Sequence, residues 1–183
     1  QALAQQALGN ELGAVVVINP DNGEVLALAT NPSYDPNVFV TGISKAMLTK
    51  LSDTETKPMF NRALRGQFPL ASTIKPFLGL GALEKGIITP TDSIEDKGHY
   101  IYPNTTHVYR DWRLDGHGIV NLRRAIQISC DTYFYELAVK MGIENIVDVL
   151  DGFGFGHTTH IDLHDEAPGL IATPIWKQTH KGT

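Results

Sequence analysis

The strongest constraint on the fold is one early hairpin signal, which is followed by mostly helical segments. The β-rich runs Ala14–Asn19 and Glu24–Ala29 flank Pro20-Asp21-Asn22-Gly23, whose residues favour a tight turn. We therefore expect a β-hairpin here. Two strands alone are marginally stable in water, so this hairpin needs other elements to pack against.

The rest of the chain favours helices and one long irregular region. A helix is expected from Ser72 to Lys85, where Pro76 is tolerated in the first turn and Gly86 stops the helix. Residues Thr89–Gly118 are rich in Asp, His, Gly and Pro and predict an ordered loop. Further helices are expected at Gln1–Glu11, Ile43–Leu51, Asn121–Ile128, Thr132–Met141 and Ile143–Leu150. This pattern predicts an α+β domain whose sheet is incomplete in this chain.

The composition excludes some classes of function. The 183 residues carry a net charge of -5, and the only adjacent basic pair is Arg123-Arg124, so we expect no nucleic-acid partner. No apolar run approaches the roughly 18 residues that span a bilayer. The single Cys130 excludes an internal disulfide.

Ser72-Thr73-Ile74-Lys75 is the first candidate for chemistry. Residues three apart lie on one helix face, so Lys75 can reach the Ser72 oxygen and act as its base. The helix start would direct backbone N–H groups at a developing oxyanion. The alternative is a helix cap with a solvated lysine. The apolar helix that follows Lys75 favours a buried lysine and hence the catalytic interpretation.

The surroundings of this tetrad resemble the active-site entry of class B penicillin-binding proteins. The resemblance rests on Asn61-Arg62-Ala63 and on Pro69-x-x-Ser72-x-x-Lys75-Pro76, together with the hairpin and the loop Pro32–Asn37. One departure is Ala71, where the family usually has glycine. Tyr109-Arg110-Asp111-Trp112, Gly116-His117-Gly118 and Trp176-Lys177-Gln178 are similar to the elongation-type members, penicillin-binding protein 2.

Ser129-Cys130-Asp131 resembles the family's second motif in its Ser-x-Asp form. In this interpretation Ser129 relays a proton between Lys75 and the leaving amine, and Asp131 holds Lys75 in place. The alternative is a helix N-cap, a position that both serine and aspartate favour.

The resemblance implies a transpeptidase fold like that of the penicillin-binding proteins and serine β-lactamases. The third motif, Lys-Ser/Thr-Gly on a strand, is missing, since Lys181-Gly182-Thr183 has the wrong order. Residues 1–183 are therefore expected to form the front part of the transpeptidase domain, without the third-motif strand and without the membrane anchor.

The implied activity is that of a serine D,D-transpeptidase that cross-links peptidoglycan stem peptides during cell elongation, through an acyl-enzyme on Ser72 that β-lactams also form. The implied setting is the periplasmic side of the inner membrane, with a glycan polymerase of the rod-shape system as partner. No cofactor is needed for acyl transfer. Two alternatives remain open: a serine β-lactamase, for which Glu166 is available as a base, and a non-catalytic β-lactam sensor or binding module.

A structural zinc is a further expectation. Asp96, Asp111, His117 and Cys130 supply two carboxylates, an imidazole and a thiolate, which suffice for a closed tetrahedral site. The set also resembles a zinc site of some elongation-type relatives, and His99 and Asp115 are possible replacements. His157, His160 and His164 are instead expected to be solvated.

Overall fold

The computed structural model describes residues 1–40 and 42–181, so Thr41 and the last two residues of Lys181-Gly182-Thr183 lie outside it. The chain divides into two compact units. The first contains Gln1–Phe68 with His160–Ala167, and the second contains Pro69–Thr159 with the residues from Pro168 onward.

The first unit is built around the predicted hairpin. Strand β1 (Gly13–Ile18) pairs antiparallel with β2 (Val25–Asn31), and Val16 lies opposite Leu28. Gly23 closes the turn with a φ of 78°. The remaining elements are α1 (Ala2–Leu8), the 3-10 helix η1 (Pro36–Phe39), α2 (Lys45–Leu51) and α3 (Arg62–Arg65). The hairpin prediction is confirmed, with strand ends displaced by one or two residues.

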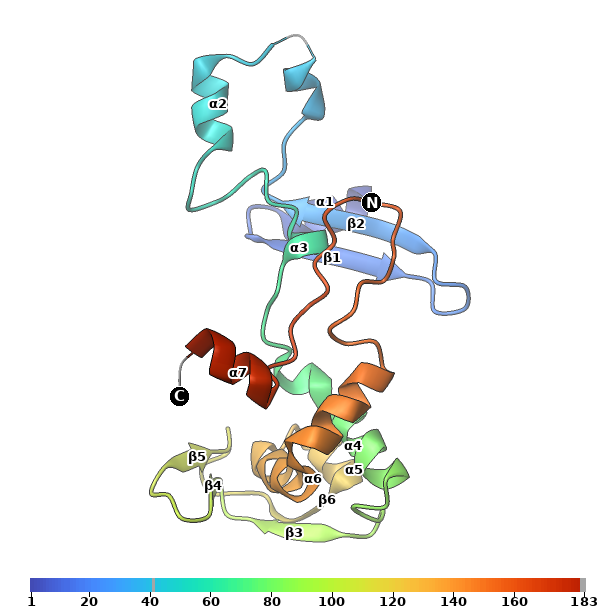
Figure 1. The fold of residues 1–183 in the computed structure, drawn as a ribbon, viewed down its shortest axis with the longest axis vertical. Coiled ribbons are helices and arrows are strands. Elements are labelled where there is room, and N and C mark those ends of the chain that lie inside the picture. Colours follow the sequence, from blue (N-terminus) through green and yellow to red (C-terminus); the bar gives the residue numbers. More distant parts are fainter. Residues whose placement is uncertain (41, 182–183) are drawn as a thin grey trace. The chain divides into compact units, whose positions relative to one another are not determined.

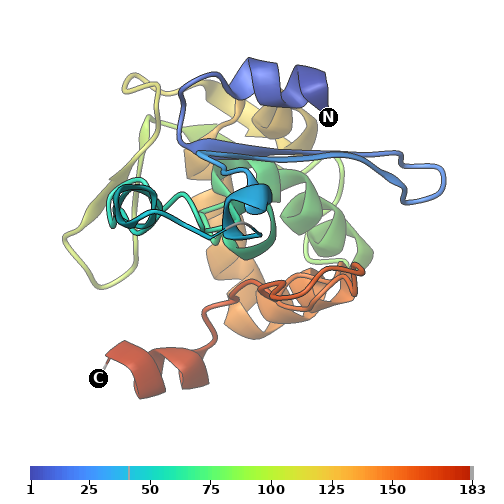
Figure 2. The same cartoon turned by 90° about the horizontal axis from the view of Figure 1, so that it is seen from above.

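Helix α1 covers the hairpin, as Figure 2 shows. The Gln1 side-chain amide accepts from Leu28 N at 2.8 Å and donates to Leu28 O at 2.9 Å, so it imitates a neighbouring strand on β2. Within residues 1–40 and 42–181 the sheet has only these two strands. Val16, Ile18 and Leu26 remain 45%, 54% and 58% exposed, which agrees with an incomplete sheet.

The second unit holds the core and the candidate site. Its helices are the 3-10 helix η2 (Ala71–Ile74), α4 (Lys75–Glu84), α5 (Leu122–Ile128), α6 (Asp131–Gly152) and α7 (Pro174–Lys181). Figure 1 shows α4, α5 and α6 packed together, and the core that they form with strand residues buries Ala82, Val120, Ala125 and Leu137 among others. Gly142 interrupts α6 with a φ of 70°, so the predicted break between two helical segments is confirmed.

The region Thr89–Gly118 differs from the predicted loop because it contains short strands. Strand β3 (Ser93–Asp96) pairs with β6 (Gly118–Asn121), and β4 (His99–Ile101) pairs with β5 (Val108–Arg110). Strands of three or four residues are too short to establish an alternating pattern in the sequence.

No helix among the described residues is long and apolar enough to cross a membrane.

Candidate active site

The Ser72 backbone is set by an unusual residue before it. Ala71 has a φ of 49°, in the left-handed region that favours glycine. This conformation explains why glycine suits the position, which is where the sequence has Ala71 in place of the glycine that the resembled family usually has. Ser72 follows in η2, and Lys75 begins α4 at once. The Lys75 side chain is buried, with 7% of the residue exposed, which excludes the solvated-lysine alternative.

Hydrogen bonds join the four residues of the first two motifs. Lys75 Nζ donates to Asp131 Oδ1 at 2.6 Å, to the Ser129 carbonyl at 2.9 Å and to Ser129 Oγ at 3.1 Å. Ser129 Oγ in turn donates to Ser72 Oγ at 2.7 Å. The sequence predicted a direct approach of Lys75 to Ser72, whereas the structure connects them through Ser129.

This arrangement has a defined chemical capacity. Three acceptors use all three protons of the Lys75 ammonium group. Lys75 can accept the Ser72 proton only after it has given one up, and the path for that proton runs through the Ser129 hydroxyl. The Phe134 ring lies 5.4 Å from Lys75 Nζ and adds a cation–π contact that sequence reasoning missed.

Ser129 and Asp131 face Lys75 because the junction between α5 and α6 is sharply turned. Ser129 ends α5 in the left-handed conformation, with φ 54° and ψ 42°. Its N–H donates to Ile126 O at 3.3 Å, and Cys130 N donates to Ala125 O at 2.9 Å, a common way to close a helix. Cys130 serves as the N-cap of α6, so the capping alternative for Ser129 and Asp131 does not apply.

The four predicted metal ligands lie together beneath this junction. One ligand atom from each of Asp96, Asp111, His117 and Cys130 can be chosen so that all four lie within 4.8 Å of one another. His117 Nδ1 lies 2.6 Å from Asp96 Oδ2, and Cys130 Sγ lies 3.5 Å from the same oxygen. Cys130 is fully buried in the second unit.

The charges in this cluster suit a cation. Burial raises the pKa of the Cys130 thiol to about 12, and the Asp96 and Asp111 carboxylates contribute to the rise. Burial also acts to raise the pKa of both carboxyls, but hydrogen bonds outweigh it and lower both pKa values. His117 Nε2 is buried and has no hydrogen-bond partner among the described residues. Two buried carboxylates, an imidazole and a thiol whose ligand atoms lie within 4.8 Å of one another form a donor set that suits a metal ion, and zinc accepts all three kinds of ligand.

The other predicted ligands lie outside this group. His99 and Asp115 are exposed, and the His99 ring contacts Lys97 O at 3.2 Å instead. His157 and His164 are exposed, as expected for solvated histidines, and His157 Nε2 pairs with Asp151 at 2.7 Å. No cluster of three possible ligands within the described part of the chain includes His157, His160 or His164.

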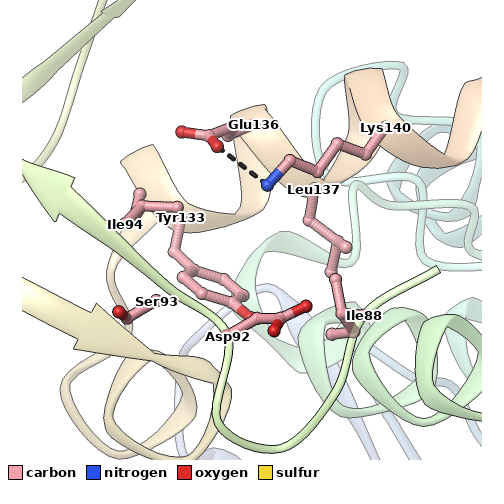
Figure 3. A pocket seen from close by; sticks show the side chains of 8 residues that line it. All are labelled: Ile88, Asp92, Ser93, Ile94, Tyr133, Glu136, Leu137 and Lys140. Carbon is pink, nitrogen blue, oxygen red and sulfur yellow. Dashed lines mark ion pairs between the residues drawn. The ribbon is translucent and has the colours of Figure 1, made fainter.

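A cavity between β3 and α6 is too small for a substrate. Figure 3 shows its lining, in which Lys140 pairs with Glu136 at 3.0 Å. Its volume of about 10 Å³ holds roughly one water molecule. Burial raises the pKa of Tyr133 there, and the carboxylates of Asp92 and Glu136 raise it further, so its hydroxyl stays protonated at neutral pH.

Comparisons with known proteins agree with this geometry. Residues 13–182 match the family model described as the penicillin binding protein transpeptidase domain. Peptidoglycan D,D-transpeptidase MrdA of Acinetobacter baumannii is 46% identical over 177 residues, which make up 97% of this chain and 26% of that relative. The chain therefore spans about a quarter of the length of this curated relative.

Solved structures show the same similarity. Pseudomonas aeruginosa PBP2 in complex with WCK 5153 matches with a TM-score of 0.90 and 45% identity, over 97% of this chain and 40% of that chain. A chain from a structure on the coordination of polymerization and crosslinking by a peptidoglycan synthase complex matches with a TM-score of 0.79 and 29% identity. That match covers 91% of this chain and 29% of the other.

Proposed function

This chain belongs to the penicillin binding protein transpeptidase domain family, and we propose that the protein is a serine D,D-transpeptidase with its nucleophile at Ser72. The observation that carries the proposal is the hydrogen-bonded series Ser72–Ser129–Lys75–Asp131. The substrate would be a peptidoglycan stem peptide ending in D-Ala-D-Ala, and β-lactams would mimic it. The name of the Acinetobacter relative supports this choice of reaction.

In the proposed reaction Ser72 Oγ attacks the carbonyl carbon of the D-Ala-D-Ala bond. Its proton passes to Ser129 Oγ while Ser129 passes its own proton to neutral Lys75. The tetrahedral intermediate then collapses, the C–N bond breaks, and terminal D-Ala leaves as an amine that takes the proton back through Ser129. An amine from a second stem peptide attacks the Ser72 ester, and Ser72 recovers its proton. Asp131 keeps Lys75 aligned throughout.

The direct test uses the full-length protein and a penicillin. We expect intact mass to increase by one β-lactam per chain and peptide mapping to place the adduct on Ser72. Ser72→Ala should abolish the adduct, whereas Ser52→Ala, which removes an exposed serine hydroxyl in the first unit, should not. An adduct on Ser129 or on another residue would contradict the proposed nucleophile.

The two alternatives have their own outcomes. A serine β-lactamase would hydrolyse a chromogenic cephalosporin continuously, while a transpeptidase forms a long-lived adduct. Glu166, the candidate base for hydrolysis, accepts a hydrogen bond from the His160 N–H at 3.2 Å within its own loop. A sensor would be acylated without cross-linking stem peptides, and a structural module would not be acylated at all.

We propose a cellular setting by analogy with the relatives. Residues 1–183 would form the front part of the transpeptidase domain of an inner-membrane protein that faces the periplasm and acts in cell elongation. A glycan polymerase of the rod-shape system would be its partner, and the similarity to a chain of a peptidoglycan synthase complex supports this choice. Co-purification of a glycan polymerase with the full-length protein tests the partnership, and recovery without any polymerase would contradict it.

We also propose that Asp96, Asp111, His117 and Cys130 hold a structural zinc ion. Bound zinc would stabilise the Cys130 thiolate and tie the segment from Asp96 to Gly118 to the start of α6. Protein purified without chelator should contain about one zinc per chain and melt at a lower temperature once a chelator is added. Less than about 0.2 zinc per chain, or melting that a chelator does not change, would contradict the site.

A further inference from the structure

Two adjacent residues, Asp111 and Trp112, contact both sides of the junction between α5 and α6. The Trp112 indole Nε1 donates to the Ile128 carbonyl, the last of α5, at 3.0 Å. Asp111 Oδ2 accepts from the N–H groups of Asp131 and Thr132, the first of α6, at 2.7 and 3.0 Å. A helix leaves its last carbonyls and its first amides without partners inside the helix. The Trp112 donor therefore pairs an unpartnered carbonyl of α5, and the Asp111 acceptor pairs two unpartnered amides of α6.

The two residues are themselves fixed in place. Asp111 N donates to Gly98 O at 2.9 Å, and Asp111 Oδ1 accepts from Arg113 N at 3.1 Å, which locks the backbone on both sides of Trp112. The Trp112 ring contacts the His117 ring at a centroid distance of 5.1 Å. The indole therefore has a defined orientation.

Packing does not account for Trp112. The residue is 63% exposed, so it adds little buried apolar surface to the core. Its hydrogen bond to the end of α5 is instead the contact by which it can affect the site.

The junction determines where the Ser129 groups point. Ser129 is left-handed, a conformation that is unfavourable for a residue with a Cβ and must be held by its surroundings. In this conformation its carbonyl accepts from Lys75 at 2.9 Å while its hydroxyl donates to Ser72 at 2.7 Å. A change in the Ser129 backbone would move both groups together.

We propose that Trp112 is a positioning residue for acylation of Ser72. With Asp111 it clamps the junction, holds Ser129 in the left-handed conformation and keeps the proton path to Lys75 continuous. This inference rests on the proposed transpeptidase reaction, because it concerns the rate of that reaction.

The experiment measures the acylation rate constant of the full-length protein and of three tryptophan variants by stopped-flow kinetics with a chromogenic cephalosporin. Trp112→Phe keeps a ring but removes the N–H donor, and Trp112→His keeps a ring N–H that can donate. Trp176→Phe is the matched control, because the Trp176 ring stacks on His180 and its indole N–H, unlike its backbone N–H, makes no hydrogen bond with the described residues. Loss of one hydrogen bond predicts an acylation rate constant about three- to tenfold lower for Trp112→Phe. Noncovalent affinity should change less than twofold, Trp112→His should recover part of the rate, and Trp176→Phe should match the wild type.

Several outcomes would overturn the inference. They are an unchanged rate constant in Trp112→Phe, a loss confined to noncovalent affinity, or equal losses in Trp112→Phe and Trp112→His. A crystal structure of Trp112→Phe supplies a readout independent of activity. Ser129 should leave the left-handed region or lose its carbonyl contact with Lys75, and an unchanged Ser129 would refute the clamp. If the wild type itself is not acylated on Ser72, the proposed function fails, while the structure of the variant still decides whether Trp112 holds the junction.

Discussion

Replacing Gly81 with alanine tests how closely α4 packs on α6. A Cβ at Gly81 would lie 2.4 and 2.5 Å from the two γ-methyl carbons of Val149, far inside van der Waals contact. Val149 is buried, with 8% exposed, so its side chain has little room to rotate away. The two helices would have to separate or Val149 would have to leave its rotamer.

The expected magnitude follows from two opposing effects. Overpacking of a core costs about 1–3 kcal/mol. Alanine is a better helix former than glycine by about 1 kcal/mol, which offsets part of that cost. We expect Gly81→Ala to lower the free energy of unfolding by up to about 2 kcal/mol, equivalent to a melting temperature up to about 8 °C lower for a domain of 150–250 residues.

The assay is thermal unfolding of the full-length protein with two further variants. Gly152→Ala is the matched control, because a Cβ at this last residue of α6 meets nothing within 4 Å and should leave the melting temperature unchanged or slightly higher. Combining Gly81→Ala with Val149→Ala removes both clashing methyl groups, so the pair should show a favourable coupling of at least about 0.5 kcal/mol. Strictly additive effects, or a Gly81→Ala protein that melts higher than the wild type, would refute the close packing.

Three further substitutions have outcomes that follow from the structure. Ala71→Gly should raise the melting temperature without loss of acylation, since glycine adopts a φ of 49° without strain, and a lower melting temperature would contradict this. Gly116→Ala should destabilise much more than Gly118→Ala in thermal unfolding: both residues have positive φ, but only the first would place its Cβ 2.2 Å from a backbone oxygen. The hydroxyl and N–H of Thr56 hold the pKa of Asp53 below its usual value. The ionised carboxylate therefore stabilises the folded state above the unfolded pKa, and this stabilisation is lost as pH falls through the folded pKa. Thr56→Val should raise the pKa of Asp53 toward its usual value in an NMR titration, and an unchanged titration would contradict the assigned cause.

The sequence predicted those features that depend on neighbouring residues. The hairpin follows from its turn residues, and the break in α6 follows from Gly142, whose φ of 70° suits a residue without a Cβ. Lys75 was expected to be buried because the apolar helix it begins has to face the core. Each of these signals lies within a few residues of the feature it predicts.

The features that the sequence did not predict depend on contacts between distant residues. The path from Lys75 to Ser72 runs through Ser129, which is 54 residues from one and 57 from the other. Ser129 is left-handed at the end of α5. Glycine or asparagine usually occupies such a position, so a serine there does not indicate this conformation. The hydrogen bond from the Trp112 indole to the Ile128 carbonyl joins two segments, and no pattern in the sequence indicates that they are neighbours.

The hydrogen bonding of Lys75 depends more on the α5–α6 junction than on α4. Helix α4 supplies Lys75, but all three atoms that accept its protons belong to Ser129 and Asp131 on either side of Cys130. If Ser129 were right-handed it would continue α5, and its carbonyl would point along the helix axis rather than at Lys75. The residues that prevent this come from the polar segment Asp96–Gly118, through Asp111 and Trp112. Substitutions in that segment should therefore alter acylation at Ser72 even where their side chains do not touch it.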